Sequence, residues 1–135
     1  MQVHYYSLDN ICTKLHNECV AWEIEFTDEF GDWWDGLCIG EQESVRVSVE
    51  LLAELGPALT RPQADTIHGS RVRNLRELRV QHEGRPYRVL YAFDPRRAGV
   101  LLIGGDKTGN PRWYAEFVPK AETIYAQHLL EIGEE

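Results

Sequence analysis

Three segments of strand character, joined by short turns, constrain the fold of this chain more than any other feature. RVRNLRELRV ends at Val80, YRVLYAF covers 87–93 and VLLIGG covers 100–105. The segments between them, QHEGRP and DPRRAG, carry the glycine and proline that mark turns. Because such short connections join neighbouring antiparallel strands, the sequence predicts an antiparallel meander in this part of the chain.

Upstream of the meander, a strand and two helices are predicted. VAWEIEF (20–26) alternates apolar and acidic residues, as a half-buried strand does. Apolar residues at helical spacing over 30–37 predict a short helix, with Thr27 or Asp28 as its N-cap. A second helix runs through EQESVRVSVELLAEL and stops at Gly56-Pro57. The two helices are expected to form an antiparallel hairpin.

A last helix is predicted near the C-terminus, where apolar residues recur at helical spacing over 121–132 and include His128 as a buried structural residue. The order of elements therefore predicts an α+β domain. Its expected form is a small twisted antiparallel sheet of about four strands, with an N-terminal helical hairpin on one face and a C-terminal helix. The loop over 59–70 and the first 19 residues are expected to be irregular, so that residues 1–19 form an extension and 20–135 the domain.

The location of charge along the chain is more informative than the net charge of −8. Residues 1–60 contain two cations and twelve acids, whereas residues 61–112 contain eleven cations and five acids, a local excess of +6. Screening limits charge effects to about 8–10 Å, so the basic middle part could bind a polyanion. The alternative is that these arginines pair with the acidic first half.

Several classes of protein are excluded or disfavoured by composition. No run of about 18 apolar residues is present, which argues against a membrane span. The N-terminus MQVHYYSLDN lacks a basic flank followed by an apolar stretch, so a signal peptide is not expected. Three cysteines, an odd number, indicate reduced thiols and a cytoplasmic location.

Motifs for nucleotides and metals are weak. GGDKTG lacks the longer loop and the Lys-Ser or Lys-Thr pair of a phosphate-binding Walker motif. Cys12, His16 and Cys19, with His4 as a fourth ligand, could approach a metal, but their spacing does not match paired Cys-x-x-Cys units. The sequence therefore predicts no metal site.

Arginines crowd the first strand of the meander, at positions 71, 73, 76 and 79, and Arg88 lies on the next strand. Strand period places Arg79 on the same face as Glu77. Guanidinium groups on one sheet face repel each other unless an anion lies among them. That anion is either Glu77, as an internal counterion, or an external phosphate.

The segment LLIGGDKTGNPRWY presents a lysine and a phenol soon after an apolar strand. The double glycine is expected to let the backbone turn tightly, so that Lys107 and Tyr114 flank one phosphate. Clustered cations would then lower the pKa of the lysine or of the phenol. The alternatives are a solvated turn lysine and a core aromatic beside Trp113.

The order of these pieces resembles the RelE/HigB-like toxins of bacterial type II toxin–antitoxin modules. The resemblance covers roughly residues 20–130. It depends on an E-L-R strand, a Y-R pair that opens the next strand, a third strand that ends in a lysine-bearing loop, a tyrosine, and an A-x-x-x-Y-x-x-H-L helix. The fold that the resemblance implies agrees with the order of elements predicted above.

The resemblance implies an endoribonuclease that cuts mRNA, usually on the ribosome, without a metal or other cofactor. The ribose 2′-hydroxyl attacks the adjacent phosphate, which requires a base, an acid and cations around the phosphorane. The catalytic residues matched by motif are Arg88, Lys107, Tyr114 and Arg79. Residues expected to hold the flanking RNA are Arg73, Arg76 and Arg112.

The resemblance also implies a partner, a cognate antitoxin that carries an amphipathic segment and a helix-turn-helix domain. The expected assembly is a homodimer of this chain or a hetero-oligomer of toxin and antitoxin. Two other functions stay open at this point. ParE-like relatives inhibit DNA gyrase and use a C-terminal segment rather than a catalytic cluster. A degenerate phage-derived module would bind a partner chain and catalyse nothing.

Overall fold

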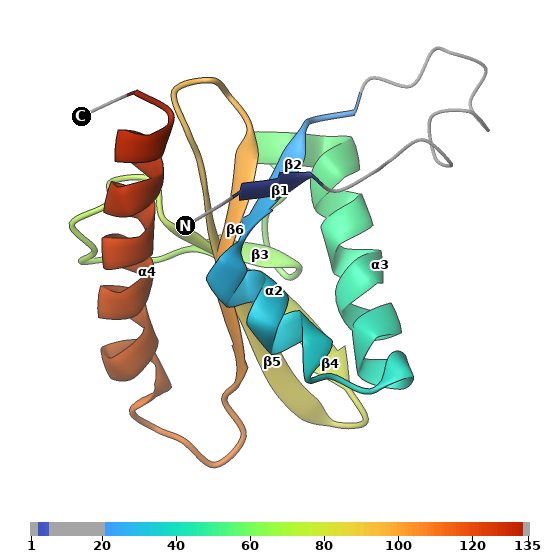
Figure 1. Ribbon diagram of the computed structural model, residues 1–135. Coiled ribbons are helices and arrows are strands. Elements are labelled where there is room, and N and C mark those ends of the chain that lie inside the picture. Colours follow the sequence, from blue (N-terminus) through green and yellow to red (C-terminus); the bar gives the residue numbers. More distant parts are fainter. Residues whose placement is uncertain (1–2, 6–20, 134–135) are drawn as a thin grey trace, which may run out of the picture.

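The computed structural model describes residues 3–5 and 21–133 and consists of one mixed sheet with helices on both faces (Figure 1). The strands are β1 (Val3–Tyr5), β2 (Ile24–Thr27), β3 (Ala64–Thr66), β4 (Arg76–His82), β5 (Arg85–Phe93) and β6 (Gly99–Asp106). The helices are α2 (Asp28–Asp35), α3 (Ile39–Leu55), the short 3₁₀ turn η1 (Gly56–Ala58) and α4 (Trp113–Glu131). None of the helices in these ranges is long and apolar enough to span a membrane.

The sheet confirms the predicted α+β class and differs from the prediction in its size. Strands lie in the order β1-β2-β6-β5-β4-β3. The predicted meander is present as β4, β5 and β6, each antiparallel to the next. Two strands of three residues were not expected: β3, within the segment predicted as a loop, and β1, within the N-terminal extension. β2 pairs in parallel with β6, so the sheet is mixed rather than fully antiparallel.

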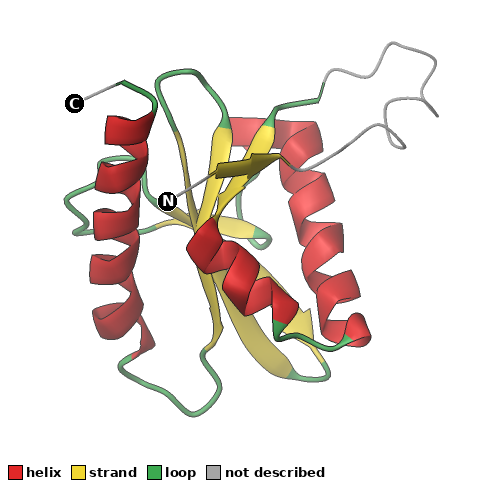
Figure 2. Ribbon diagram, in the orientation of Figure 1, coloured by secondary structure: helices red, strands yellow, loops and turns green. Residues whose placement is uncertain are grey.

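Helices cover both faces of the sheet because β5 and β6 are apolar on both sides. α2 and α3 pack on one face and α4 packs on the other (Figures 1 and 2). Val89 and Tyr91 of β5 are buried under α2 and α3, whereas Leu90 and Ala92 are buried under α4. The prediction of the N-terminal helices on one face and a separate C-terminal helix is therefore confirmed, and each face has its own hydrophobic core.

The predicted N-cap of the first helix is Thr27. Its Oγ1 accepts a hydrogen bond from the backbone N–H of Phe30 at 3.2 Å, which satisfies one of the free donors at the start of α2. The same hydroxyl donates to the carbonyl of Leu102 at 2.7 Å, across 75 residues of sequence. Thr27 therefore fixes both the start of α2 and its attachment to β6.

The double glycine lies inside β6 rather than in a turn, which corrects the prediction made from the sequence. A Cβ at Gly104 would lie 2.3 Å from the ring of Trp33, and a Cβ at Gly105 would lie 2.6 Å from Nε1 of Trp113. The two glycines thus make room for one tryptophan on each face of the sheet. The chain turns later, at Gly109, where φ is +67°.

α4 begins at Trp113, eight residues before the predicted start, and continues through Pro119. Trp113 is 1% exposed, and its ring stacks on that of Phe117 at 4.5 Å between centroids. At its other end, His128 is fully buried, as predicted, with Nε2 2.8 Å from Asp94 Oδ2. Asp94 in turn bonds Arg96, which also reaches Glu25 at 2.8 Å. Aromatic packing at one end and a buried polar network at the other hold α4 on the sheet.

Candidate active site

Strand register brings two arginines and a glutamate together on the face that α4 covers. Arg79 of β4 lies directly opposite Arg88 of β5, and Arg88 lies opposite Gly105 of β6. Glu77 is two residues before Arg79 and points to the same face. Like charges directly opposite each other on one face destabilise a sheet unless an anion compensates them.

Tyr114, in the first turn of α4, completes a buried polar cluster with Arg88 and Glu77. Arg88 is 5% exposed, and its Nε donates to the Tyr114 hydroxyl at 3.3 Å. That hydroxyl donates to Oε1 of Glu77 at 2.6 Å. Arg88 Nε also lies 3.4 Å from the same carboxylate oxygen. Glu77 is therefore the internal counterion that the sequence left as one of two choices.

The pKa of Tyr114 is raised, mainly because burial disfavours the phenolate and further because its hydroxyl donates to Glu77. The expectation that nearby cations would lower the pKa of this phenol is therefore wrong. Tyr114 is a neutral phenol near pH 7 that donates one hydrogen bond and accepts another. Such a group can pass a proton between two neighbours.

Lys107 lies beside this cluster, with its Nζ 5.1 Å from the centre of the Tyr114 ring. Its backbone N–H donates to the carbonyl of Pro86 at 3.0 Å, at the edge of the sheet. The preceding residue, Asp106, accepts from the backbone N–H of Thr108 at 2.9 Å and from Arg85 at 3.3 Å. Because successive strand residues face opposite sides, holding Asp106 on the α3 face directs Lys107 to the α4 face.

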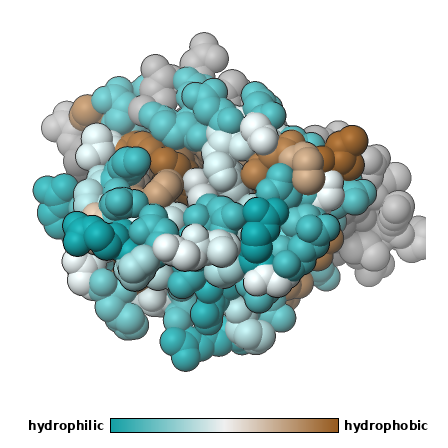
Figure 3. Space-filling model, turned by 90° about the horizontal axis from the view of Figure 1, so that it is seen from below, coloured by the Kyte–Doolittle hydropathy of each residue, from teal (hydrophilic) through white to brown (hydrophobic). Residues whose placement is uncertain are grey.

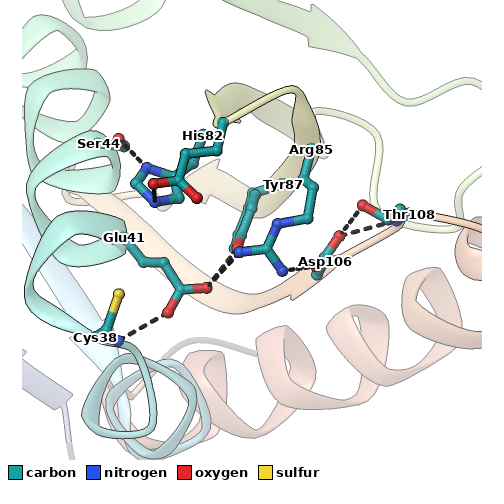
Figure 4. Close-up of polar contacts among 9 residues, drawn as sticks. Cys38, Glu41, Ser44, His82, Arg85, Tyr87, Asp106 and Thr108 are labelled. Carbon is teal, nitrogen blue, oxygen red and sulfur yellow. Dashed lines mark hydrogen bonds and ion pairs between the residues drawn. The ribbon is translucent and has the colours of Figure 1, made fainter.

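A second polar cluster supports this loop from the α3 face (Figure 4). The Tyr87 hydroxyl donates to Glu41 of α3, and Arg85 lies 3.4 Å from the same carboxylate. The hydrogen bond from Tyr87 is the largest cause of a Glu41 pKa lowered to about 2. Burial is the largest cause of a Tyr87 pKa raised to about 12. The loop with Lys107 is thus linked through Asp106 and Arg85 to the N-terminal turn of α3. No pattern in the sequence indicated this cluster, because its members lie far apart along the chain.

The structure brings four of the seven sequence-predicted site residues together, namely Arg79, Arg88, Lys107 and Tyr114. Arg79 is partly exposed, and within residues 3–5 and 21–133 its side chain makes no hydrogen bond. Arg73 and Arg112 are exposed, in the loop before β4 and at the N-cap of α4. Arg76 lies on the opposite face, where it donates to the carbonyls of Pro57 and Leu59 at 3.1 and 2.7 Å. Arg76 is therefore not placed with the other predicted RNA contacts.

The surface around the lower ends of β4, β5 and β6, as they are drawn in Figure 1, is mainly hydrophilic. Figure 3 shows this end of the molecule from below, with hydrophobic residues confined to separate areas. Among the residues that the structure describes, no three His, Cys, Asp or Glu side chains are grouped as metal ligands would be. The weak candidates Cys12, His16 and Cys19, and the side chain of His4, lie outside the described residues.

Comparison with known proteins gives a consistent set of relatives. Residues 32–126 match the family described as "Phage derived protein Gp49-like (DUF891)". The chain is 38% identical over 116 residues to a Mycobacterium tuberculosis protein named "Putative toxin HigB2", a match that covers 84% of this chain and 57% of that protein. It is 42% identical over 91 residues to "Putative toxin HigB3" of the same organism, covering 67% of this chain and 78% of that protein. No solved structure matches the chain.

Proposed function

Because this chain belongs to the Gp49-like family of phage-derived proteins, we propose that it is the toxin of a toxin–antitoxin pair and an endoribonuclease of the RelE/HigB-like kind. Two relatives that are named as toxins support the first half of this proposal. The second half depends on the site. Its substrate would be mRNA in the cytoplasm, on or off the ribosome.

The observation that carries the nuclease proposal is the charge balance on the α4 face. Arg79 and Arg88 face each other across two strands, Lys107 lies beside them, and Glu77 is the acid bonded within the cluster. Asp65 of β3 lies opposite Glu77 and interacts electrostatically with Arg79. Three cations beside these two carboxylates leave a positive charge, which would favour a further anion such as a phosphate. Arg79, which makes no side-chain hydrogen bond to the described residues, is the group available to bind it first.

The geometry suggests how each group would act on an RNA phosphate. The ribose 2′-hydroxyl would give its proton to the Tyr114 oxygen while Tyr114 gives its own proton to Glu77, along the existing 2.6 Å hydrogen bond. Arg88 and Arg79 would stabilise the charge that develops on the phosphorane. Lys107 would protonate the departing 5′-oxygen. The products would be a 2′,3′-cyclic phosphate and a 5′-hydroxyl.

A partner follows from the same proposal. A toxin of this kind is held inactive by an antitoxin, and such a chain would cover the surface at Arg79 and Lys107. The antitoxin is expected to contribute an amphipathic segment attached to a helix-turn-helix domain. The complex would be a hetero-oligomer, with or without a toxin homodimer inside it.

The test uses purified protein and a defined RNA, with a chelator present, followed by mapping of the ends. Wild type is expected to leave cyclic phosphate ends. Tyr114→Phe is expected to lower the rate about 10²–10⁴-fold, the range for a lost proton-transfer group. Tyr125→Phe is the matched control, because Tyr125 lies in the same helix and away from the cluster. Intact RNA with wild-type protein, both alone and on translating ribosomes without chelator, would refute the proposal, as would equal rates for the two variants.

A further inference from the structure

An open groove of about 620 Å³ adjoins the cluster and has no role in the mechanism above. Residues 66–69, before β4, line one side, and Ala115, Val118 and Pro119 of α4 line the other. Glu77 and Tyr114 also line it, so the groove and the reacting groups share two residues. Its volume lies within the range of small-ligand sites, about 300–1,000 Å³.

The groove is formed without a ligand because a glutamate fastens its two sides together. Glu122 of α4 accepts from the Ser70 hydroxyl at 2.8 Å and from the backbone N–H of Arg71 at 2.7 Å. Arg71 Nε lies 3.2 Å from the other carboxylate oxygen. These contacts hold the segment before β4 against α4. A groove that is already formed can orient a ligand without the cost of ordering a loop.

The charge of the groove is unsuited to a phosphate. Its walls contain two carboxylates, Glu77 and Glu122, and one arginine, Arg71, which is already engaged by Glu122. Apolar side chains, including Ile67 and Val118, make up much of the rest. An anion would be repelled, whereas a flat neutral ring with polar edges would find both apolar contact and hydrogen-bond partners.

A nucleobase is such a ring, and the position of Tyr114 at the edge of the groove determines which base of the RNA would bind there. On the proposed mechanism the reacting ribose places its 2′-hydroxyl at Tyr114, at the edge of the groove. The base on that ribose belongs to the nucleotide on the 5′ side of the cut. The geometry points to the groove as the binding site for this base, with Arg79, Arg88 and Lys107 holding the phosphate next to it. This inference rests on the proposed nuclease function.

The test compares three RNA oligonucleotides around one mapped cut: the intact strand, the strand without the base 5′ of the cut, and the strand without the base 3′ of the cut. Two variants accompany wild type. Ala115→Trp fills the groove from an exposed position of α4. Ala126→Trp is the matched control, the same change in the same helix, about 16 Å further along its axis and outside the groove.

For wild type and Ala126→Trp, we expect loss of the 5′ base to lower kcat/KM at least about tenfold, and loss of the 3′ base to lower it less than about threefold, a difference of about 0.7 kcal/mol or more. Ala115→Trp should cut the three strands at similar rates, and each of these rates should be lower than the rate at which wild type cuts the intact strand. Equal sensitivity to either base in wild type, or an Ala115→Trp profile like that of wild type, would overturn the inference. Both outcomes require cleavage, so they differ from failure of the proposed function, in which no strand is cut.

Discussion

Gly104 and Gly105 allow a sharp test of how the sheet holds α4. Replacing either glycine by alanine adds one methyl group, and the two methyl groups point to opposite faces of β6. At Gly104 the new Cβ would lie 2.3 Å from the ring of Trp33, and at Gly105 it would lie 2.6 Å from Nε1 of Trp113. Favourable contacts between heavy atoms lie at about 3.5–4.0 Å, so each ring must move by roughly 1 Å.

The expected cost follows from how freely each ring can move. Overpacking a core by one methyl group costs about 1–3 kcal/mol, while alanine gains about 0.5–1 kcal/mol over glycine in a strand. Trp33 is partly exposed and can shift toward solvent, so Gly104→Ala should lower the free energy of unfolding by about 1 kcal/mol. Trp113 is buried and stacked on Phe117, so Gly105→Ala should cost about 2 kcal/mol.

Urea unfolding followed by tryptophan fluorescence measures both values, and RNA cleavage at matched concentrations of folded protein separates their consequences. Gly105→Ala displaces the first turn of α4 and with it Tyr114, so its cleavage rate should fall at least tenfold. Gly104→Ala should keep the wild-type rate, because Trp33 lies on the other face. The reasoning is wrong if both variants unfold within 0.5 kcal/mol of wild type, or if Gly104→Ala slows cleavage as much as Gly105→Ala does.

Three further predictions concern separate parts of the molecule. Arg79→Ala should weaken RNA binding and make the slope of log K for RNA association against log salt shallower by about one, without changing the free energy of unfolding. Filter binding at several salt concentrations measures this slope, and an unchanged slope would contradict the prediction. Asp94→Asn should lower the free energy of unfolding by about 1–3 kcal/mol, because it weakens the buried bonds to His128 and Arg96; urea unfolding should show the loss, and wild-type stability would disprove it. The pKa of Glu41 falls from 4.5 to about 2 on folding, so its stabilising effect is complete above pH 4.5 and is lost as the pH falls toward 2. Glu41→Gln should therefore reduce the dependence of the free energy of unfolding on pH between 4.5 and 2. A pH profile of stability identical to that of wild type would rule this out.

Local patterns in the sequence predicted the parts of the fold that local interactions determine. The meander followed from short turns between strand segments, and the start of α2 followed from the capping ability of Thr27. The pairing of β2 with β6 could not be predicted in this way, because it joins segments about 75 residues apart that carry no complementary signal. The start of α4 was missed since Pro119 suggests a break, whereas stacking of Trp113 on Phe117 stabilises the helix there.

The candidate site was predicted in its residue types and only partly in its arrangement. The resemblance to RelE/HigB-like toxins indicated Arg88, Lys107 and Tyr114, and the structure places them together. Successive side chains of a strand alternate between its two faces, so Arg76 and Arg79 must lie on opposite faces. The position of Arg76 on the other face could therefore have been predicted. The role of the double glycine could not, because it depends on tryptophans that approach β6 from opposite faces, and one of them, Trp33, lies far away in the sequence.

The attachment of Tyr114 to the last helix has a consequence for synthesis of the protein. The arginines of β4 and β5 precede α4 in the chain and therefore leave the ribosome before it. Until α4 docks, Arg88 and Glu77 lack the phenol that joins them. On the proposed function, a polypeptide whose last helix has not yet docked on the sheet is harmless to the transcript that encodes it.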